Sequence, residues 1–89
     1  MKIKVELYGA SKDFSSENII KLDLKNNSRI KDLRNELIKF IDKKHNGNNN
    51  FCQIIKSSAF CSENNEIISD NYKITKNQKI GIIPPIGGG

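Results

Sequence analysis

Residues 29–45 read RIKDLRNELIKFIDKKH and form the most regular pattern in the chain. Apolar residues recur there at helical spacing, and charged or amide residues fill most of the positions between them; the residues with this spacing are Ile30, Leu33, Leu37, Phe40 and Ile41. Such a stripe predicts an amphipathic helix with one face against a core. Ser28 is the expected N-cap, and Gly47 is the expected stop signal.

Two alternating segments precede this helix. Residues 2–8 and 20–25 alternate apolar with polar side chains, which is the period of a half-buried strand. The stretch between them, residues 9–16, is polar and turn-like. We therefore predict a β-hairpin in which Ile3, Val5 and Leu7 face the core.

The chain after the helix is less regular. The sequence HNGNNN, residues 45–50, predicts a polar loop without a functional role, and its histidine is interpreted as a helix-end cation. Residues 53–61 are predicted as a third strand, and Ile67-Ile68 as a short strand or turn. The last strand holds Ile80 and Ile82 and is ended by Pro84.

The predicted order is therefore β-β-α-β-(β)-β, which indicates an α+β domain with one helix layered on a mixed sheet. Among small folds this order favours the β-grasp (ubiquitin-like) roll. We expect residues 1–83 to form this domain, with its first and last strands side by side in the middle of the sheet. Residues 84–89 are predicted to leave it as a flexible, extended C-terminal tail.

Composition limits the class of protein. A chain of 89 residues can form one core but leaves little room for a deep active site. The net charge of +5 is carried by lysines in nearly every segment and by only two arginines. We interpret these lysines as a solvated surface, which argues against nucleic-acid binding. The sequence shows no membrane segment and no signal peptide, so we expect a cytoplasmic protein without membrane partners.

The two cysteines do not suggest a metal site. Cys52 and Cys61 lie outside any CxxC motif, and the chain has a single histidine. Since a structural zinc site needs four ligands, no metal is predicted. Free thiols are the main interpretation, and a disulfide is the alternative.

The chain ends in IIPPIGGG, residues 82–89. Two aliphatic residues precede Pro84-Pro85, and a β-branched residue, a small residue and Gly-Gly follow them. This order resembles the C-terminal sequence of the small subunit of molybdopterin synthase (the MoaD family), a ubiquitin-like sulfur carrier. Ile3-Lys4-Val5 also fits the opening strand of that family. The chain departs from the family at Gly87, where Ser, Ala or Thr is more usual, and in the turn at residues 76–79, which lacks the usual acids.

The resemblance implies a chemistry for the chain end. An E1-like adenylyltransferase (MoeB-like) would use ATP to adenylate the carboxylate of Gly89, and a sulfur donor protein would convert it to a thiocarboxylate. The tail would then enter the large subunit (MoaE-like), and sulfur would pass to cyclic pyranopterin monophosphate to form the molybdopterin dithiolene. The tail residues are Pro84, Pro85, Ile86, Gly87 and Gly88.

The same resemblance makes this chain a non-catalytic sulfur-donor subunit of a heterotetrameric sulfurtransferase. It implies no bound cofactor, because ATP is used by the activating enzyme. Glycines suit a narrow channel, and prolines reduce the entropy lost on insertion. Strand parity leaves Tyr8 and Ile83 on one exposed face, and the resemblance adds Ile67 as a third residue that docks on the large subunit.

Three alternative functions remain. The same carrier chemistry could serve tRNA thiolation, thiamine thiazole synthesis or protein modification, although Pro84-Pro85 favours molybdopterin synthase. A ubiquitin-like interaction domain would have a chemically silent tail. A basic nucleic-acid-binding module would need arginines and aromatic residues on one face.

Overall fold

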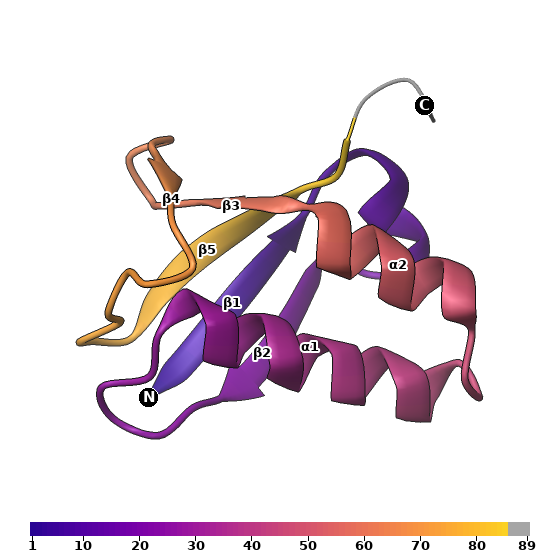
Figure 1. Ribbon diagram of the computed structural model, residues 1–89, viewed down its shortest axis with the longest axis horizontal. Helices are drawn as coiled ribbons and strands as arrows, with labels where there is room; N and C mark the ends of the chain where they lie inside the picture. Colours follow the sequence, from indigo (N-terminus) through magenta and orange to yellow (C-terminus); the bar gives the residue numbers. More distant parts are fainter. Residues whose placement is uncertain (86–89) are drawn as a thin grey trace.

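The computed structural model describes residues 1–85, in which short strands are interleaved with helices. One sheet is formed by five strands in the spatial order β2-β1-β5-β3-β4 (Figure 1). The elements along the chain are β1 (Lys2–Leu7), η1 (Gly9–Phe14, a 3-10 helix), β2 (Ile19–Asp23), α1 (Ile30–Lys44), α2 (Asn49–Ser57), β3 (Ala59–Cys61), β4 (Ile67–Ile68) and β5 (Gln78–Ile83).

The first and last strands lie together in the middle of the sheet, as predicted. β1 pairs with β5 in parallel, with Val5 opposite Ile80 and Leu7 opposite Ile82. The other pairings are antiparallel, so the sheet is mixed. The predicted hairpin of β1 and β2 and the short β4 are also confirmed.

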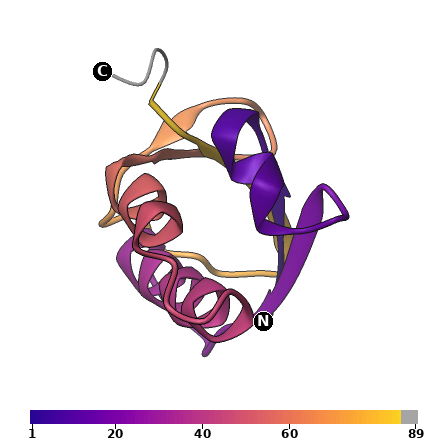
Figure 2. The same cartoon turned by 90° about the vertical axis from the view of Figure 1, so that its right-hand side faces the viewer.

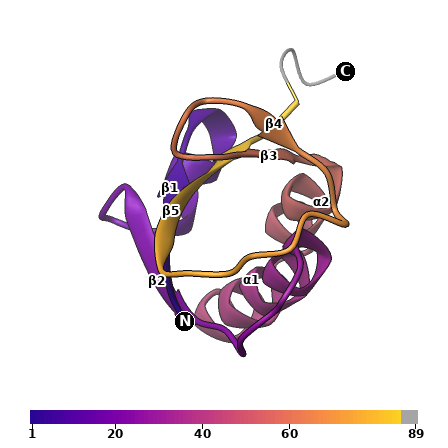
Figure 3. The ribbon, with the colours of Figure 1, turned by 90° about the vertical axis from the view of Figure 1, so that its left-hand side faces the viewer.

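Helices α1 and α2 cover one face of the sheet, which we call the inner face (Figures 2 and 3). Strand alternation sends every second side chain of β1 and β5 into the core between the two layers. This core is built mainly from isoleucine and leucine with two phenylalanines, and it includes Ile3, Val5, Leu7, Phe14, Leu33, Leu37, Ile55, Phe60, Ile80 and Ile82. Within residues 1–85, no helix lies over the opposite, outer face of the sheet (Figures 2 and 3).

Helix α1 matches the prediction to within one residue at each end. Its N-cap is Arg29 and not Ser28, because the Ser28 hydroxyl donates to the carbonyl of Lys25 at 2.7 Å and so does not cap the helix. The carboxylate of Asp32 accepts the Arg29 backbone N–H at 2.8 Å and satisfies this end. Directly after the C-cap His45, Asn46 adopts a left-handed φ of +53°, and the N–H of Gly47 donates to the carbonyl of Asp42 at 2.9 Å. The helix therefore ends before Gly47, as expected.

The predictions of a loop at residues 45–50 and a strand at residues 53–61 are wrong in part. Residues 49–57 form helix α2, and only Ala59–Cys61 is extended. The side-chain oxygen of Asn48 accepts the Phe51 N–H at 3.2 Å and caps the helix. Phe51 and Ile55 then fall on one helical face, and Ile55 is fully buried.

Arg34 joins the two helices to the sheet. Its guanidinium donates to the carbonyls of Ile55 and Ser58 at 2.6 and 2.7 Å, at the C-terminal end of α2. It also pairs with Asp70 at 2.7 Å and stacks 4.8 Å from the ring centroid of Phe60. Carbonyls at a helix end lack intrahelical partners, so a cation placed there is favourable.

A second contact ties η1 to the helices. Phe14 lies in the segment predicted as a polar turn, yet its side chain is fully buried. Its carbonyl accepts a hydrogen bond from Nε2 of His45 at 2.8 Å. The His45 ring also meets Phe51 edge-on at 4.8 Å, so this residue packs between segments in addition to standing at a helix end.

Candidate functional site

The root of the tail is anchored beside η1. β5 leads from the centre of the sheet to Pro84, which is buried, and to Pro85, which is exposed. Gly9, whose φ of +55° favours glycine, lies near Pro84, because a Cβ added at Gly9 would lie 3.9 Å from Cδ of Pro84. The predicted tail residues Ile86, Gly87, Gly88 and Gly89 lie outside the described residues.

An apolar group of side chains surrounds this root on the outer face of the sheet. Tyr8, Cys61 and Ile83 line one shallow hollow together with Asn65. Tyr8 is 39% exposed, and Ile67, which stands opposite Cys61 on β4, is 66% exposed. We call Tyr8, Cys61, Ile67 and Ile83 the outer cluster. It contains the three residues predicted to dock on a partner, and Cys61 is an addition.

Gly81 makes the outer cluster possible, and sequence reasoning missed it. A Cβ at this position would lie 2.7 Å from Sγ of Cys61 and 2.8 Å from Cε2 of Tyr8. Both distances are shorter than atoms tolerate, so the bare backbone of β5 lets the thiol and the ring lie flat over the sheet. The signal in the sequence was a glycine between the apolar residues of a predicted strand.

A chain of polar contacts extends from the cluster across the sheet. The Tyr8 hydroxyl donates to Oε1 of Glu6 at 2.5 Å, and Nζ of Lys79 lies 3.0 Å from the other carboxylate oxygen. The hydrogen bond from Tyr8 lowers the pKa of Glu6, and the contact with Lys79 lowers it further. The same hydrogen bond raises the pKa of Tyr8, because ionised Tyr8 would face a carboxylate.

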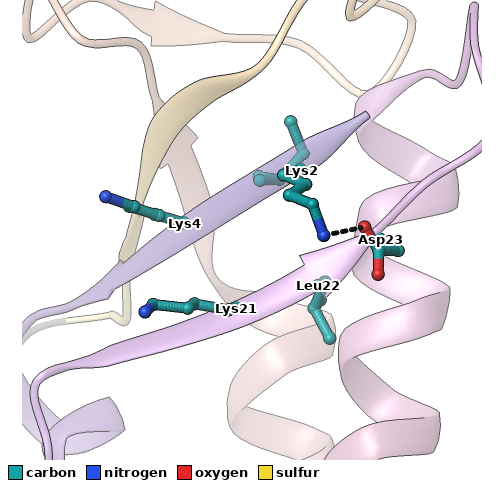
Figure 4. Close-up of a pocket in the computed structure, with 6 residues that line it drawn as sticks. Lys2, Lys4, Lys21, Leu22 and Asp23 are labelled. Carbon is teal, nitrogen blue, oxygen red and sulfur yellow. Dashed lines mark hydrogen bonds and ion pairs between the residues drawn. The ribbon is translucent and has the colours of Figure 1, made fainter.

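Beyond Glu6 the outer face carries several lysines, with Glu63 close to Lys79 and Asp23 close to Lys2. Lys4 on β1 stands directly opposite Lys21 on β2 and directly opposite Lys79 on β5. We call Lys21, Lys4 and Lys79 the lysine row. Figure 4 shows Lys4 and Lys21 extending together from neighbouring strands, whereas Lys2 turns to Asp23 at 3.5 Å. The expectation that the lysines are only scattered is therefore wrong for this face, because the register of the sheet gathers them.

The described residues offer surfaces for binding and little for catalysis. Within residues 1–85, no three His, Cys, Asp or Glu side chains are grouped to hold a metal ion. Cys52 and Cys61 are both free thiols. In the same range, no helix has the length and apolar character needed to cross a bilayer. The arrangement therefore presents a tail root next to an apolar cluster and a basic row.

Comparison with known proteins places the fold. No protein-family model matches the sequence, and neither does any curated protein. Among solved structures, SAMP1 from Haloferax volcanii matches over 100% of both chains with a TM-score of 0.70 at 12% sequence identity. A protein described as molybdopterin converting factor subunit 1 from Pyrococcus furiosus matches with a TM-score of 0.63 at 16% identity, covering 96% of this chain and 98% of that chain. The fold is a ubiquitin-like β-grasp. At these identities the likeness concerns the fold, and it agrees with the resemblance found in the sequence.

Proposed function

We propose that this protein is a ubiquitin-like sulfur carrier that acts through the carboxylate of Gly89. The observation that carries the proposal is the exit of the chain from the sheet. The central strand β5 runs into Pro84, which is buried near Gly9, and the sequence then continues as Pro-Ile-Gly-Gly-Gly. A buried root with two prolines, followed at the chain end by three glycines, suits insertion into a narrow channel.

The chemistry follows from the weakness of a carboxylate as an electrophile. The Gly89 carboxylate attacks the α-phosphate of ATP on an E1-like adenylyltransferase, and pyrophosphate leaves. Hydrosulfide, delivered by a sulfur donor protein, then displaces AMP and leaves a thiocarboxylate. Both steps use active sites on partner proteins, which fits a chain whose described residues offer surfaces for binding and little for catalysis.

We further propose that the sulfur acceptor is cyclic pyranopterin monophosphate, bound to a larger partner subunit of a molybdopterin synthase. The tail pattern with Pro84-Pro85 supports this acceptor, and so does the fold likeness to the converting factor from Pyrococcus furiosus. The outer cluster would dock on the larger subunit beside the opening that admits the tail. Two rounds of transfer supply the two sulfur atoms of the dithiolene.

A second candidate is the same carrier chemistry with another acceptor, in tRNA thiolation, thiamine thiazole synthesis or protein modification. The likeness to SAMP1, with its TM-score of 0.70, supports this alternative. Incubation of the thiocarboxylate form with cyclic pyranopterin monophosphate and the larger subunit separates the two. Formation of molybdopterin supports the first acceptor, and an unchanged thiocarboxylate favours the second.

The carrier role itself is tested by mass spectrometry on protein purified from its native cells. Trypsin cleavage after Lys79 releases the C-terminal peptide IGIIPPIGGG, which contains no cysteine. We expect this peptide to show an oxygen-to-sulfur mass gain and to react with a thiol alkylator. A matched variant with one alanine added after Gly89 should show neither. A carboxylate that stays unmodified with ATP, an activating enzyme and a sulfur donor would contradict the proposal.

A further inference from the structure

The lysine row places like charges opposite one another on three neighbouring strands. Residues directly opposite each other in neighbouring strands have Cβ atoms about 5 Å apart, and like charges there destabilise a sheet. Lys79 is paired with Glu6, but within residues 1–85 Lys4 and Lys21 have no acidic partner. An acidic surface placed over the row would remove this repulsion.

The lysine row and the outer cluster belong to one continuous surface. Tyr8 lies four residues beyond Lys4 along the β1 segment, a distance of about 13 Å in extended chain. Glu6 stands between them and contacts both Tyr8 and Lys79. A protein that docks on Tyr8 and Ile83 therefore extends over the lysine row as well.

We propose that the lysine row docks on an acidic surface of the protein that adenylates the C-terminal carboxylate, next to the socket for the outer cluster. This inference rests on the proposed carrier function and adds the chemistry of the partner. A carrier must find one partner, leave it and find the next. Complementary charge raises the association rate of two proteins more than it lowers the dissociation rate, so it suits this exchange.

The composition of the outer face favours a protein over a nucleic acid as the partner. Both arginines lie elsewhere, and each donates to backbone carbonyls, Arg29 to Asn71 and Arg34 to Ile55. The aromatic residue on this face is Tyr8, whose ring lies over Gly81 and whose hydroxyl is held by Glu6. A single aromatic residue offers one stacking position, whereas surfaces that bind single strands stack successive bases on several aromatic side chains.

The test uses a pair of variants with the same change in net charge. Lys4→Glu/Lys21→Glu reverses two charges of the row, and Lys31→Glu/Lys43→Glu reverses two exposed lysines at opposite ends of α1. Association with the purified adenylating enzyme is followed by stopped flow, and adenylation is followed by ATP–pyrophosphate exchange. At low ionic strength the row variant should associate at least about tenfold more slowly than wild type. The α1 variant should stay within about twofold, and high salt should remove the difference.

Each outcome has a defined meaning. Equal association rates for the two variants, with wild type adenylated normally, would overturn the lysine-row inference and leave the carrier function intact. Failure of wild type to be adenylated would overturn both. Binding of labelled single-stranded RNA by wild type and the α1 variant, but not by the row variant, would make the row a nucleic-acid surface and overturn the inference. If the row variant does not melt cooperatively, the glutamate variants are replaced by Lys4→Gln/Lys21→Gln and Lys31→Gln/Lys43→Gln. The association rate should again be lower for the variant of the lysine row than for the variant of α1.

Discussion

The two faces of the sheet use neighbouring residues of the same type in opposite ways. Ile82 points to the inner face and is fully buried among the core residues, whereas Ile83 points to the outer face and lines the hollow beside Tyr8. The inner face is closed by two helices, and the outer face is left open. The apolar side chains on the inner face therefore determine the fold, and those on the outer face are available for partners.

The largest expected effect separates these two isoleucines. Ile82→Ala should lower the free energy of unfolding by about 2–5 kcal/mol, because it leaves a cavity in the core. Ile83→Ala removes the same atoms from a partly exposed side chain and should cost no more than about 1 kcal/mol. Urea denaturation of both variants measures the difference. Similar losses at the two positions would mean that the outer face also carries the stability of the fold.

The second prediction concerns the layer that closes the inner face. Arg34→Ala should cost about 2–3 kcal/mol, because it leaves the carbonyls at the end of α2 without their charged donor. Amide hydrogen exchange should show the largest loss of protection in α2. The matched control on the outer face is Lys79→Ala, which breaks an exposed ion pair and should cost less than about 1 kcal/mol. Arg34→Ala with no effect on α2 protection would contradict this role.

Much of the fold could be predicted because its residues repeat with a clear period. Alternation in β1 and β5 and the apolar stripe of α1 each continue long enough to specify one structure. Helix α2 could not be predicted in the same way, because it has only nine residues and its Ile54-Ile55 pair also fits a buried strand. The asparagine run before it looks like a loop unless Asn48 is recognised as an N-cap.

The candidate site could be predicted where the alternation of side chains along a strand is enough to assign a residue to one face of the sheet. Parity placed Tyr8 and Ile83 on one face, and the structure brings them to one hollow. The lysine row depends on which residues stand opposite one another in the sheet, and a single sequence does not give that register. Gly81 was missed for the same reason, since its neighbours Tyr8 and Cys61 come from other strands.

The third prediction tests whether the outer face is as closely packed as the inner face at one point. Gly81→Ala would stabilise an ordinary strand, because alanine loses less backbone entropy than glycine. Here its Cβ collides with Cys61 and Tyr8, so we expect a loss of about 1–3 kcal/mol. The double variant Gly81→Ala/Cys61→Ala should lose less than the sum of the two single variants, as a double-mutant cycle would measure. A stabilised Gly81→Ala variant would show that Tyr8 and Cys61 move aside freely.

The smallest expected effect is electrostatic and confined to the outer face. Tyr8→Phe keeps the aromatic ring over Gly81 but removes the hydroxyl that donates to Glu6. The pKa of Glu6 should therefore rise toward its ordinary value of 4.5, and Lys79→Ala, which removes a hydrogen bond and a positive charge from the same carboxylate, should also raise it. NMR titration of the Glu6 carboxyl measures both shifts.

The sign of the pH dependence follows from the same contact. Because the pKa of Glu6 is lowered in the folded protein, its contribution to stability is present above the ordinary value of 4.5 and is lost as the pH falls through the lowered pKa. Tyr8→Phe should therefore be slightly less stable than wild type near neutral pH, where this contribution is present, and the two proteins should become equally stable as the pH falls below the lowered pKa. An identical Glu6 titration in wild type and Tyr8→Phe would mean that the hydroxyl faces solvent, and the polar link between the outer cluster and the lysine row would then be lost.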